Sequence, residues 1–367
     1  MDTNLNIEER VILTLDAGGT NFVFSAIQGN KEIIEPINKK SNAHNLEKCL
    51  DTVIEGFEEI NSQLSEKASA ISFAFPGPAD YKKGIIGDLP NFKAFNNNVA
   101  LGPMLEDHFN LPVFINNDGN LFAYGEALTG FLPEINKKIL NNKGIKQFRN
   151  LTGLTLGTGF GCGIVINNIL LEGDNSCDAG IHATLNKNHS NWNAEESVST
   201  RAIQRVYATE SGIDFSSDLM PKDIFEIAKG IKNGNKSAAI ESFKQFGEAL
   251  GSSITNISTL IDGIIVIGGG ITAAWDLFAP AMFDEINQQI ENFEGVKSNR
   301  LPVKIYNLED ENMLKEFSLG DIKEIQVPKS NRSVKHDNAQ RIGIGISKLG
   351  ASKAIALGAY AYAIQNM

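Results

Sequence analysis

The sequence predicts an α/β protein made of two related domains, and three observations support this fold class. First, residues 11–27 are typical of a β-hairpin, because an apolar strand ends at Asp16, a Gly18–Thr20 turn follows, and a second alternating strand begins. Second, the same order of strand, Gly/Thr turn and strand returns over residues 151–171. Third, the chain has 367 residues, which is enough for two domains of ordinary size. A repeated hairpin in a chain of this length indicates a duplicated domain.

The two glycine-rich turns are suited to bind an anion. Glycine lets backbone N–H groups approach an anion closely, and Thr20 adds a hydroxyl. Asp16 would repel a phosphate unless a cation lay between them, so it predicts Mg²⁺ on a nucleotide, held directly or through water. The alternative is a tight turn without a ligand, but the recurrence favours two turns that hold the phosphates of one nucleotide. The expected nucleotide contacts are Asp16, Gly18, Gly19, Thr20, Gly157, Thr158, Gly159 and Gly161.

Composition and charge limit the partners and the compartment. The net charge of −11 argues against nucleic acid or an anionic membrane as the main partner. The sequence has no run of about 18 apolar residues and its first residues do not resemble a signal peptide, so we expect a cytoplasmic protein without a membrane span. The three cysteines, Cys49, Cys162 and Cys177, stand singly, which predicts neither a zinc site nor a disulfide framework.

Two loops at predicted strand ends are candidates for substrate binding. The buried strand at 69–75 ends in a rigid Pro-Gly-Pro segment that contains Gly77 and Pro78. Asn91, in the following loop, would present an amide to a hydroxyl group, or would serve only as a turn residue. Ligands of α/β sheets bind at such strand ends, so we expect substrate contacts here.

The pair Asn117–Asp118 lies where an apolar strand stops and a helix begins at once. One interpretation is structural, because Asp is favoured as a helix N-cap. The other is functional: the positive end of the helix dipole favours a carboxylate, which would act as a general base for a hydroxyl proton in a water-poor cleft. The two interpretations of Asp118 are compatible.

Several segments are predicted to be helical or irregular. Residues 44–64 have apolar side chains at helical spacing, and residues 221–257 are predicted to be helical throughout. Residues 131–150 are expected to form a polar loop with a short helix. Residues 172–193 show little periodicity, and long irregular segments of this kind tend to be functional or mobile. Glu195 then stands in the first turn of a helix, where the structural alternative is a favourable interaction with the helix dipole.

A third glycine-rich segment follows a buried strand that starts at residue 263. Gly268, Gly269 and Gly270 lie between this strand and a helix, a junction that can receive a nucleoside or a phosphate. Residues 299–340 are charge-mixed and aperiodic, so they are expected to form an insertion.

These motifs together resemble the ROK family (repressor, open reading frame, kinase) of sugar kinases over nearly the whole chain. Asp16–Asn21 and Leu156–Gly161 resemble its two phosphate motifs. Ile267–Ile271 resembles its adenosine motif, and Asn117–Asp118 resembles the pair whose Asp is the catalytic base. The resemblance implies the actin-like ATPase fold, also called ribonuclease H-like, with a nucleotide cleft between two domains.

The expected domain boundaries follow from this resemblance. Residues 1–118 with 352–367 would form a small N-terminal domain that holds the first phosphate motif, the sugar loops and the catalytic Asp. Residues 119–351 would form a large domain that holds the second phosphate motif, the adenosine motif and the insertion at about 299–340.

The resemblance also implies a set of sugar contacts, with two departures from the family. Where the family has Glu-Ile-Gly-His, this chain has Ser176–His182, which puts Gly180 or Asp178 at the glutamate position. No zinc-binding cysteines follow. The expected sugar contacts are Gly77, Pro78, Asn91, Asn117, Asp118, Glu195 and His182.

The function predicted from the sequence is ATP-dependent phosphorylation of a hexose or N-acetylhexosamine, at the 6-hydroxyl. Asp118 would be the general base, and Mg²⁺ would bridge the β- and γ-phosphates near Asp16. A homodimer is expected because dimers are common in similar proteins. One alternative is a sugar-binding sensor without kinase activity, suggested by the altered segment 180–182. Another is a different actin-like ATPase, such as a chaperone or a filament protein, although those lack the Pro-Gly-Pro loop and the Asn-Asp pair.

Overall fold

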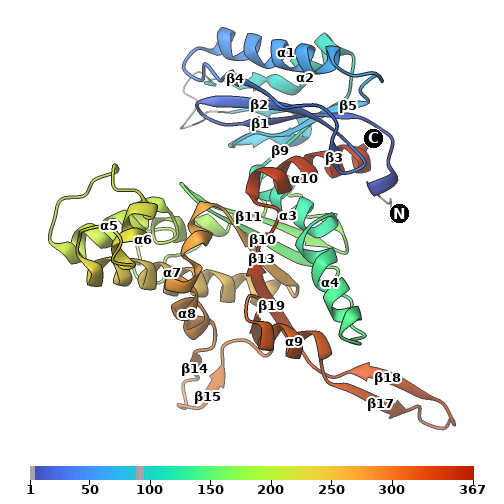
Figure 1. Ribbon diagram of the computed structural model, residues 1–367. Helices are drawn as coiled ribbons and strands as arrows, with labels where there is room; N and C mark the ends of the chain where they lie inside the picture. Colours follow the sequence, from blue (N-terminus) through green and yellow to red (C-terminus); the bar gives the residue numbers. More distant parts are fainter. Residues whose placement is uncertain (1–4, 88, 90–94, 97) are drawn as a thin grey trace. The chain divides into compact units, whose positions relative to one another are not determined.

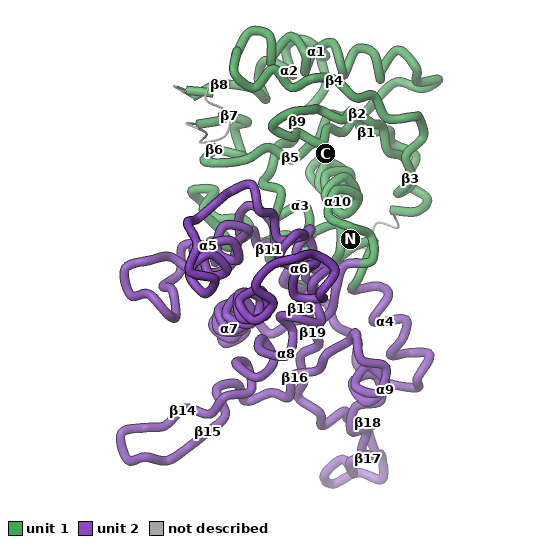
Figure 2. The backbone as a smooth tube through the Cα atoms, turned by 60° about the vertical axis from the view of Figure 1, so that its left-hand side comes forward, with its two compact units in different colours: residues 1–131, 163–179, 348–367 green, residues 132–162, 180–347 purple. Residues whose placement is uncertain are grey.

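A computed structural model describes residues 5–87, 89, 95–96 and 98–367 of the chain (Figure 1). The fold comprises two compact units, shown in different colours in Figure 2. Unit 1 consists of Met1–Phe131, Gly163–Ala179 and Lys348–Met367, and unit 2 of Leu132–Cys162 and Gly180–Ser347. The expected domain boundary after residue 118 is drawn from the positions of the motifs, whereas the two units are defined by contacts within the structure. The expected boundary therefore stays a prediction.

Unit 1 contains a six-stranded mixed sheet. Its strand order is β3-β2-β1-β5-β9, and β4 pairs with β2. β1 and β2 form the predicted antiparallel hairpin, while β1, β5 and β9 run parallel. The carboxyl ends of these parallel strands therefore lie at one edge of the sheet. The strands are β1 (Ile12–Ala17), β2 (Asn21–Gln28), β3 (Lys31–Glu32), β4 (Ile37–Lys40), β5 (Ala70–Ala74) and β9 (Val113–Asn116).

Helices cover both faces of this sheet (Figure 1). α1 (Leu46–Ser62) and α2 (Leu101–Phe109) lie on one face, and α10 (Ala351–Asn366) lies on the other. The predicted amphipathic helix is α1, whose N-cap side chain, Asn45, accepts a hydrogen bond from the Lys48 N–H. Its Phe57 packs edge-on against Phe24 of β2, with ring centroids 5.2 Å apart. The aromatic core between sheet and helices follows from the apolar periodicity of these elements.

α3 (Asp118–Leu128) packs closely against α10. Glycines make this approach possible, because a Cβ on Gly125 would lie 2.0 Å from the Ala354 oxygen and one on Gly358 would lie 1.9 Å from the Leu121 oxygen. The start of α3, and with it Asp118, is therefore fixed by backbone-to-backbone packing.

The remaining elements of unit 1 are short. Three strands form a small antiparallel sheet, and β12 pairs with the end of β11. The elements are η1 (Leu5–Ile7), β6 (Ala79–Asp80), η2 (Tyr81–Lys83), β7 (Ile85–Ile86), β8 (Val99–Ala100), β11 (Phe160–Ile166, which begins in unit 2) and β12 (Ile169–Leu170).

Unit 2 is built on parallel strands in the order β10-β13-β19-β16. α5, α6 and α8 pack against the long helix α7, and α9 packs against β16. The strands are β10 (Leu151–Leu156), β13 (Ile264–Gly268), β16 (Lys304–Asn307) and β19 (Arg341–Ile346). The helices are α4 (Phe131–Asn141), η3 (Ile181–Ala183), η4 (Ala194–Glu196), α5 (Thr200–Ser211), α6 (Pro221–Ala228), α7 (Lys236–Leu260), η5 (Gly270–Ala274), α8 (Trp275–Ile286) and α9 (Glu311–Leu319).

The structure corrects three expectations about this unit. The expected polar loop with a short helix at 131–150 contains a helix of three turns, α4. The segment 221–257 is not helical throughout, because α6 ends at Ala228 and α7 begins at Lys236. Part of the expected insertion belongs to the core, since β16 pairs in parallel with β19. A strand of four residues is too short for its alternation to be recognised in a charged context.

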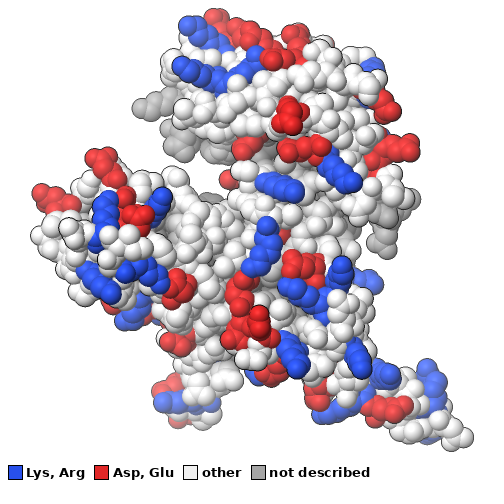
Figure 3. All heavy atoms as spheres, in the orientation of Figure 1, with Lys and Arg blue, Asp and Glu red and all other residues white. Residues whose placement is uncertain are grey.

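Two hairpins extend from the rest of unit 2 (Figure 2). One consists of β14 (Gln289–Glu291) and β15 (Lys297–Asn299), and the other of β17 (Ile322–Gln326) and β18 (Ser333–Asp337). On the face of the described residues that Figure 3 shows, acidic and basic side chains are interspersed. Among the helices of the described residues, none is long and apolar enough to cross a membrane.

Candidate functional site

The first glycine turn, Gly18–Thr20, joins β1 to β2 in unit 1. The Gly18 N–H donates to the Asp16 carbonyl over 3.2 Å. A Cβ on Gly18 would lie 2.8 Å from the Asn21 oxygen, so the turn requires glycine there. Asp16 is exposed at the end of β1, beside the turn, as the sequence predicted.

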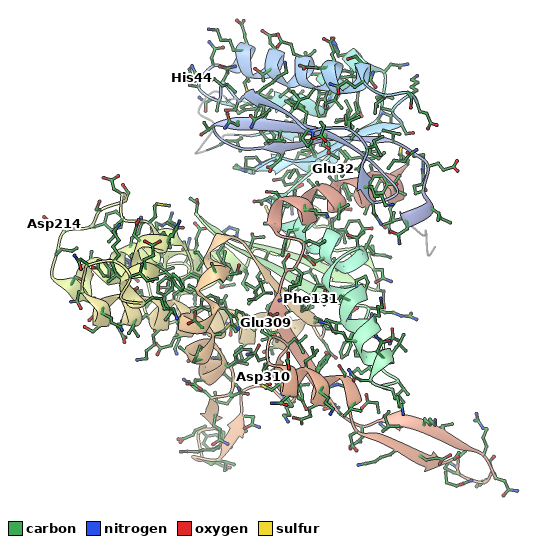
Figure 4. All side chains as sticks on the ribbon, viewed as in Figure 1. Glu32, His44, Phe131, Asp214, Glu309 and Asp310 are labelled. Carbon is green, nitrogen blue, oxygen red and sulfur yellow. The ribbon has the colours of Figure 1, made fainter. Side chains whose placement is uncertain are left out.

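Asp16 also borders a cleft of about 510 Å³ between the sheet and the start of α10. Glu32 also lines this cleft (Figure 4). Its carboxylate accepts a hydrogen bond from the Ser25 hydroxyl over 3.1 Å. Lys353 of α10 lines the cleft as well. Asp16 therefore faces open space, where a cation can reach it.

The second glycine turn, Gly157–Gly159, joins β10 to β11. The Gly157 N–H donates to the Gly159 oxygen over 3.1 Å, which closes the turn. Thr158 is exposed at its tip. Gly161, which was expected to contact the nucleotide, lies one residue inside β11. The third glycine segment lies beside this turn in unit 2, because Gly268 pairs with Thr155 near the end of β10.

Gly269 adopts a backbone conformation that favours glycine, with φ of +96°. A Cβ at this position would lie 2.2 Å from the Leu156 oxygen. Gly270 opens η5, which leads into α8, and the Thr272 hydroxyl donates to the Gly269 oxygen over 2.7 Å. Gly269 thus allows this segment to approach the strand that carries the second turn.

Glu195 contacts the second turn directly. Its Oε2 atom accepts a hydrogen bond from the Phe160 N–H over 3.0 Å, and its Oε1 atom is 3.0 Å from Nη2 of Arg201. A Cβ on Gly159 would lie 2.8 Å from the same Oε2 atom. The residue lies in η4, before α5, whose N-cap is Ser199. The sequence did not indicate that the carboxylate lies against the phosphate turn.

Asp118 begins α3 directly after β9, as the sequence predicted for this pair. The N-cap is Asn117 and not Asp118, because the Asn117 Oδ1 atom accepts the Gly119 N–H over 2.8 Å. The Asp118 Oδ1 atom accepts from the same N–H, also over 2.8 Å. The structure thus separates the roles: Asn117 caps the start of the helix, and the Asp118 carboxylate has a further oxygen for another partner.

The pKa of Asp118 is raised above its ordinary value of 3.8. The side chain is exposed, yet the surrounding protein removes enough hydration to disfavour its charged form. Hydrogen bonds from the backbone N–H groups of Gly119 and Asp118 oppose this effect, and the negative charge of Asp16 adds to it. The N–H groups at the helix terminus therefore lower the pKa by less than desolvation raises it, and the carboxylate is a stronger base than a solvated Asp.

We expect the variant Asp118→Asn to be more stable than the wild type at neutral pH. A carboxyl with a raised pKa in the folded chain costs stability at any pH above that pKa, where both states are ionised. The cost shrinks as the pH falls through the folded-state pKa and is absent below the unfolded-state value. The Tm of the variant should therefore exceed that of the wild type at pH 7, and the difference should vanish below about pH 4.

Thermal unfolding at a series of pH values tests this expectation. Asp107→Asn is the matched control, because Asp107 is an exposed carboxylate on α2 of the same unit. An Asp118→Asn variant that is less stable than the wild type at pH 7 would contradict the expectation.

Tyr81 connects two of the predicted sugar-contacting segments, although no pattern in the sequence indicates this role. Its hydroxyl donates to the Phe75 carbonyl over 2.9 Å and accepts a hydrogen bond from the Asn117 Nδ2 atom over 3.4 Å. A Cβ on Gly77 would lie 3.0 Å from this hydroxyl. The structure therefore brings the loop with Gly77 and Pro78 and the Asn117–Asp118 pair together around Tyr81.

Asp178 is a second carboxylate near this group. Its Oδ2 atom accepts a hydrogen bond from the Asn120 Nδ2 atom over 2.7 Å, and its Oδ1 atom accepts the Gly173 N–H over 2.9 Å. The negative charges of Asp118 and Asp178 both raise the pKa of Tyr81, after the larger effect of its burial. The segment before Gly180 thus lies beside the Asn117–Asp118 pair, within unit 1.

The other predicted sugar contacts are not brought into this group. Asn91 lies outside the described residues. His182 is exposed in η3 of unit 2, and Glu195, also in unit 2, contacts the second turn. Within the residues that the structure describes, no three His, Cys, Asp or Glu side chains are grouped to hold a metal ion.

Comparison with known proteins places these motifs in one family. The ROK family model matches residues 12–312. A crystal structure of a glucokinase from Parabacteroides distasonis is 49% identical, with a TM-score of 0.90 and full coverage of both chains. A glucokinase from Thermotoga maritima is 24% identical over 77% of this chain and 90% of its own. A xylose repressor from Bacillus subtilis is 22% identical over 77% of this chain and 69% of its own.

The family match covers both glycine turns, the Asn-Asp pair and the third glycine segment. The likeness in structure extends over the whole chain. The predicted actin-like ATPase fold is confirmed, and the chain belongs to the ROK family.

Proposed function

We propose that this protein is an ATP-dependent kinase that phosphorylates a hydroxyl of a hexose or an N-acetylhexosamine, at the 6-position. The observation that carries the proposal is the relation between Asp16 and Asp118 in unit 1. Asp16 stands beside a glycine turn, and Asp118 has a raised pKa. The negative charge of Asp16 contributes to the rise in the pKa of Asp118. A phosphate turn and a candidate base are thus close enough to interact. The glucokinases from P. distasonis and T. maritima support a sugar as the acceptor.

In this proposal each unit contributes one glycine turn to the phosphates of ATP. The N–H groups of Gly18–Thr20 and Gly157–Gly161 would donate to phosphate oxygens, and Gly268–Gly270 would border the adenosine. Asp16 is an exposed carboxylate, which fits a Mg²⁺ ion bound to the nucleotide. When bound, the ion would offset the charge of the β- and γ-phosphates.

Asp118 would accept the proton of the sugar hydroxyl as the γ-phosphoryl group is transferred. Its raised pKa makes it a better proton acceptor than a solvated Asp, and it remains ionised only above that pKa. Asn117, Gly77, Pro78 and Asn91 would orient the sugar. Glu195 and His182, from unit 2, would do so once the two units close on the substrate.

The alternative function is a sugar-binding regulator without kinase activity. Two observations favour it: Gly180 or Asp178 stands where the family has a glutamate, and the xylose repressor is among the relatives. The presence of both glycine turns and of Asp118 favours the kinase. A cytoplasmic location and a homodimer remain part of the proposal.

The test is ADP release from Mg-ATP by the purified protein with a panel of sugars. The panel contains glucose, fructose, mannose, allose, N-acetylglucosamine and N-acetylmannosamine. Release with one of them, lost in Asp118→Asn, would support the kinase and name its substrate. Sugar binding without release would favour the regulator, and ADP release that needs no sugar would favour another actin-like ATPase.

A further inference from the structure

Ser41 holds the first glycine turn through two hydrogen bonds. Its N–H donates to the Thr20 carbonyl over 2.9 Å, and its hydroxyl donates to the Gly19 carbonyl over 2.7 Å. β4 positions it, because Lys40 pairs with Asn21 at the start of β2 and Ser41 follows directly. The side chain is 1% exposed, so its hydroxyl has little access to water.

Thr200 holds the second glycine turn in the same way. Its N–H and its Oγ1–H both donate to the Gly157 carbonyl, over 2.8 and 3.0 Å. It is the first residue of α5, which follows the N-cap Ser199. In each unit, then, one residue with a hydroxyl donates both its backbone N–H and its side chain to carbonyls of the turn.

The N–H groups at the tips of the two turns differ from the turn carbonyls in their hydrogen-bond partners. Within the residues that the structure describes, those of Gly19 and Thr20 in the first turn donate to no protein acceptor. In the same described part of the chain, the N–H groups of Thr158 and Gly159 in the second turn also donate to no protein acceptor. Consecutive N–H groups of this kind form an anion-binding concavity. Carbonyl oxygens would repel a phosphate, so a turn binds best when its carbonyls are engaged elsewhere.

We propose that Ser41 and Thr200 are positioning residues for the nucleotide phosphates. Each engages the carbonyls of a glycine turn and so fixes its peptide planes with the N–H groups free for phosphate oxygens. The inference rests on the proposed function, because it takes the phosphates of ATP as the ligand. Neither residue is a catalytic residue, since both act through the turn backbone.

The experiment measures binding of the nonhydrolysable analogue AMPPNP with Mg²⁺, without sugar, to Ser41→Ala and Thr200→Val. Each variant loses one hydroxyl bond to a turn carbonyl and keeps the backbone bond. We expect the Kd for the nucleotide to rise about three- to tenfold in each, which corresponds to one hydrogen bond. The double variant should show roughly the product of the two effects. Thr200→Ser keeps the hydroxyl and should restore wild-type affinity.

Two control variants remove the same kind of bond away from the turns. The Thr209 hydroxyl donates to the Arg205 carbonyl on α5 over 3.0 Å, and the Ser62 hydroxyl donates to the Glu59 carbonyl on α1 over 2.8 Å. Thr209→Val and Ser62→Ala should leave the Kd for the nucleotide unchanged. In turnover, Ser41→Ala and Thr200→Val should raise KM for ATP, with KM for the sugar within about twofold of the wild type.

Each outcome decides the inference. A lower Tm with an unchanged Kd in both variants would mean a purely structural role and would overturn it, as would an equal loss in the controls. If Ser41→Ala does not fold, the comparison of Thr200→Val with Thr200→Ser still tests the proposal at the second turn. Nucleotide binding without turnover on any sugar would count against the kinase alone. A wild type that binds no nucleotide would overturn both proposals.

Discussion

Replacing Asp118 with Asn is expected to lower kcat by about 10²–10⁴-fold, the usual effect of losing a general base. Asn keeps the size of the side chain and an oxygen for the Gly119 N–H, but it cannot accept the proton of the sugar hydroxyl. Sugar affinity should change much less, because Asn117, the Gly77–Pro78 loop and the turns are untouched. The loss should therefore appear in kcat and not in KM.

The measurement is the steady-state rate with the sugar that the panel identifies. Asp107→Asn, which removes an exposed carboxylate from α2, is the control and should keep wild-type kinetics. The wild-type kcat/KM should also fall as the pH decreases through the pKa of Asp118, at a pH above the ordinary value of 3.8. Near-normal turnover in Asp118→Asn would exclude Asp118 as the base.

The features that could be predicted from the sequence are those set by neighbouring residues. The hairpin of β1 and β2 is defined by alternation on either side of a glycine turn, and the start of α3 by a strand that stops at Asn116, just before the cap Asn117. Turn and cap signals extend over a few residues, so a single sequence contains them in full.

The features that could not be predicted depend on residues far apart in the chain. Ser41 is 22 residues from Gly19, Thr200 is 43 from Gly157, and Asn120 is 58 from Asp178. No periodicity or turn signal indicates such pairs, because tertiary packing alone brings them together. The same reason explains Glu195, whose contact with the Phe160 N–H joins positions 35 residues apart.

Arg341 is the other residue whose replacement should have a large effect, here on stability. It is 1% exposed at the start of β19, although arginine is rarely buried without partners. Its Nε atom donates to the Phe317 carbonyl over 2.7 Å, and its Nη1 atom is 2.8 Å from Oδ2 of Asp337. The guanidinium also lies 5.2 Å from the ring centroid of Phe317, which stacks on Phe148. One side chain thus joins α9, the base of the β17–β18 hairpin and the central sheet of unit 2.

Arg341→Leu is expected to lower the free energy of unfolding by about 3–5 kcal/mol, which is the usual cost of leaving one charge of a buried ion pair without its partner. Burial raises the pKa of Asp337, but hydrogen bonds from the Asp321 N–H and from Arg341 lower it below its ordinary value. Without Arg341 the Asp337 carboxylate would lose its counter-charge while its side chain is still buried. Urea unfolding measures the change, with Arg332→Leu as the control. Arg332 is exposed on the hairpin, so its loss should stay within about 0.5 kcal/mol.

A double variant separates the ion pair from the packing of the arginine. In Arg341→Leu with Asp337→Asn the uncompensated charge is gone, so the combined loss should be smaller than the sum of the two single losses. Additive losses would show that packing against Phe317 and Phe148, and not the pair with Asp337, gives Arg341 its effect. A loss below about 1 kcal/mol for Arg341→Leu would contradict a stabilising role for this buried pair.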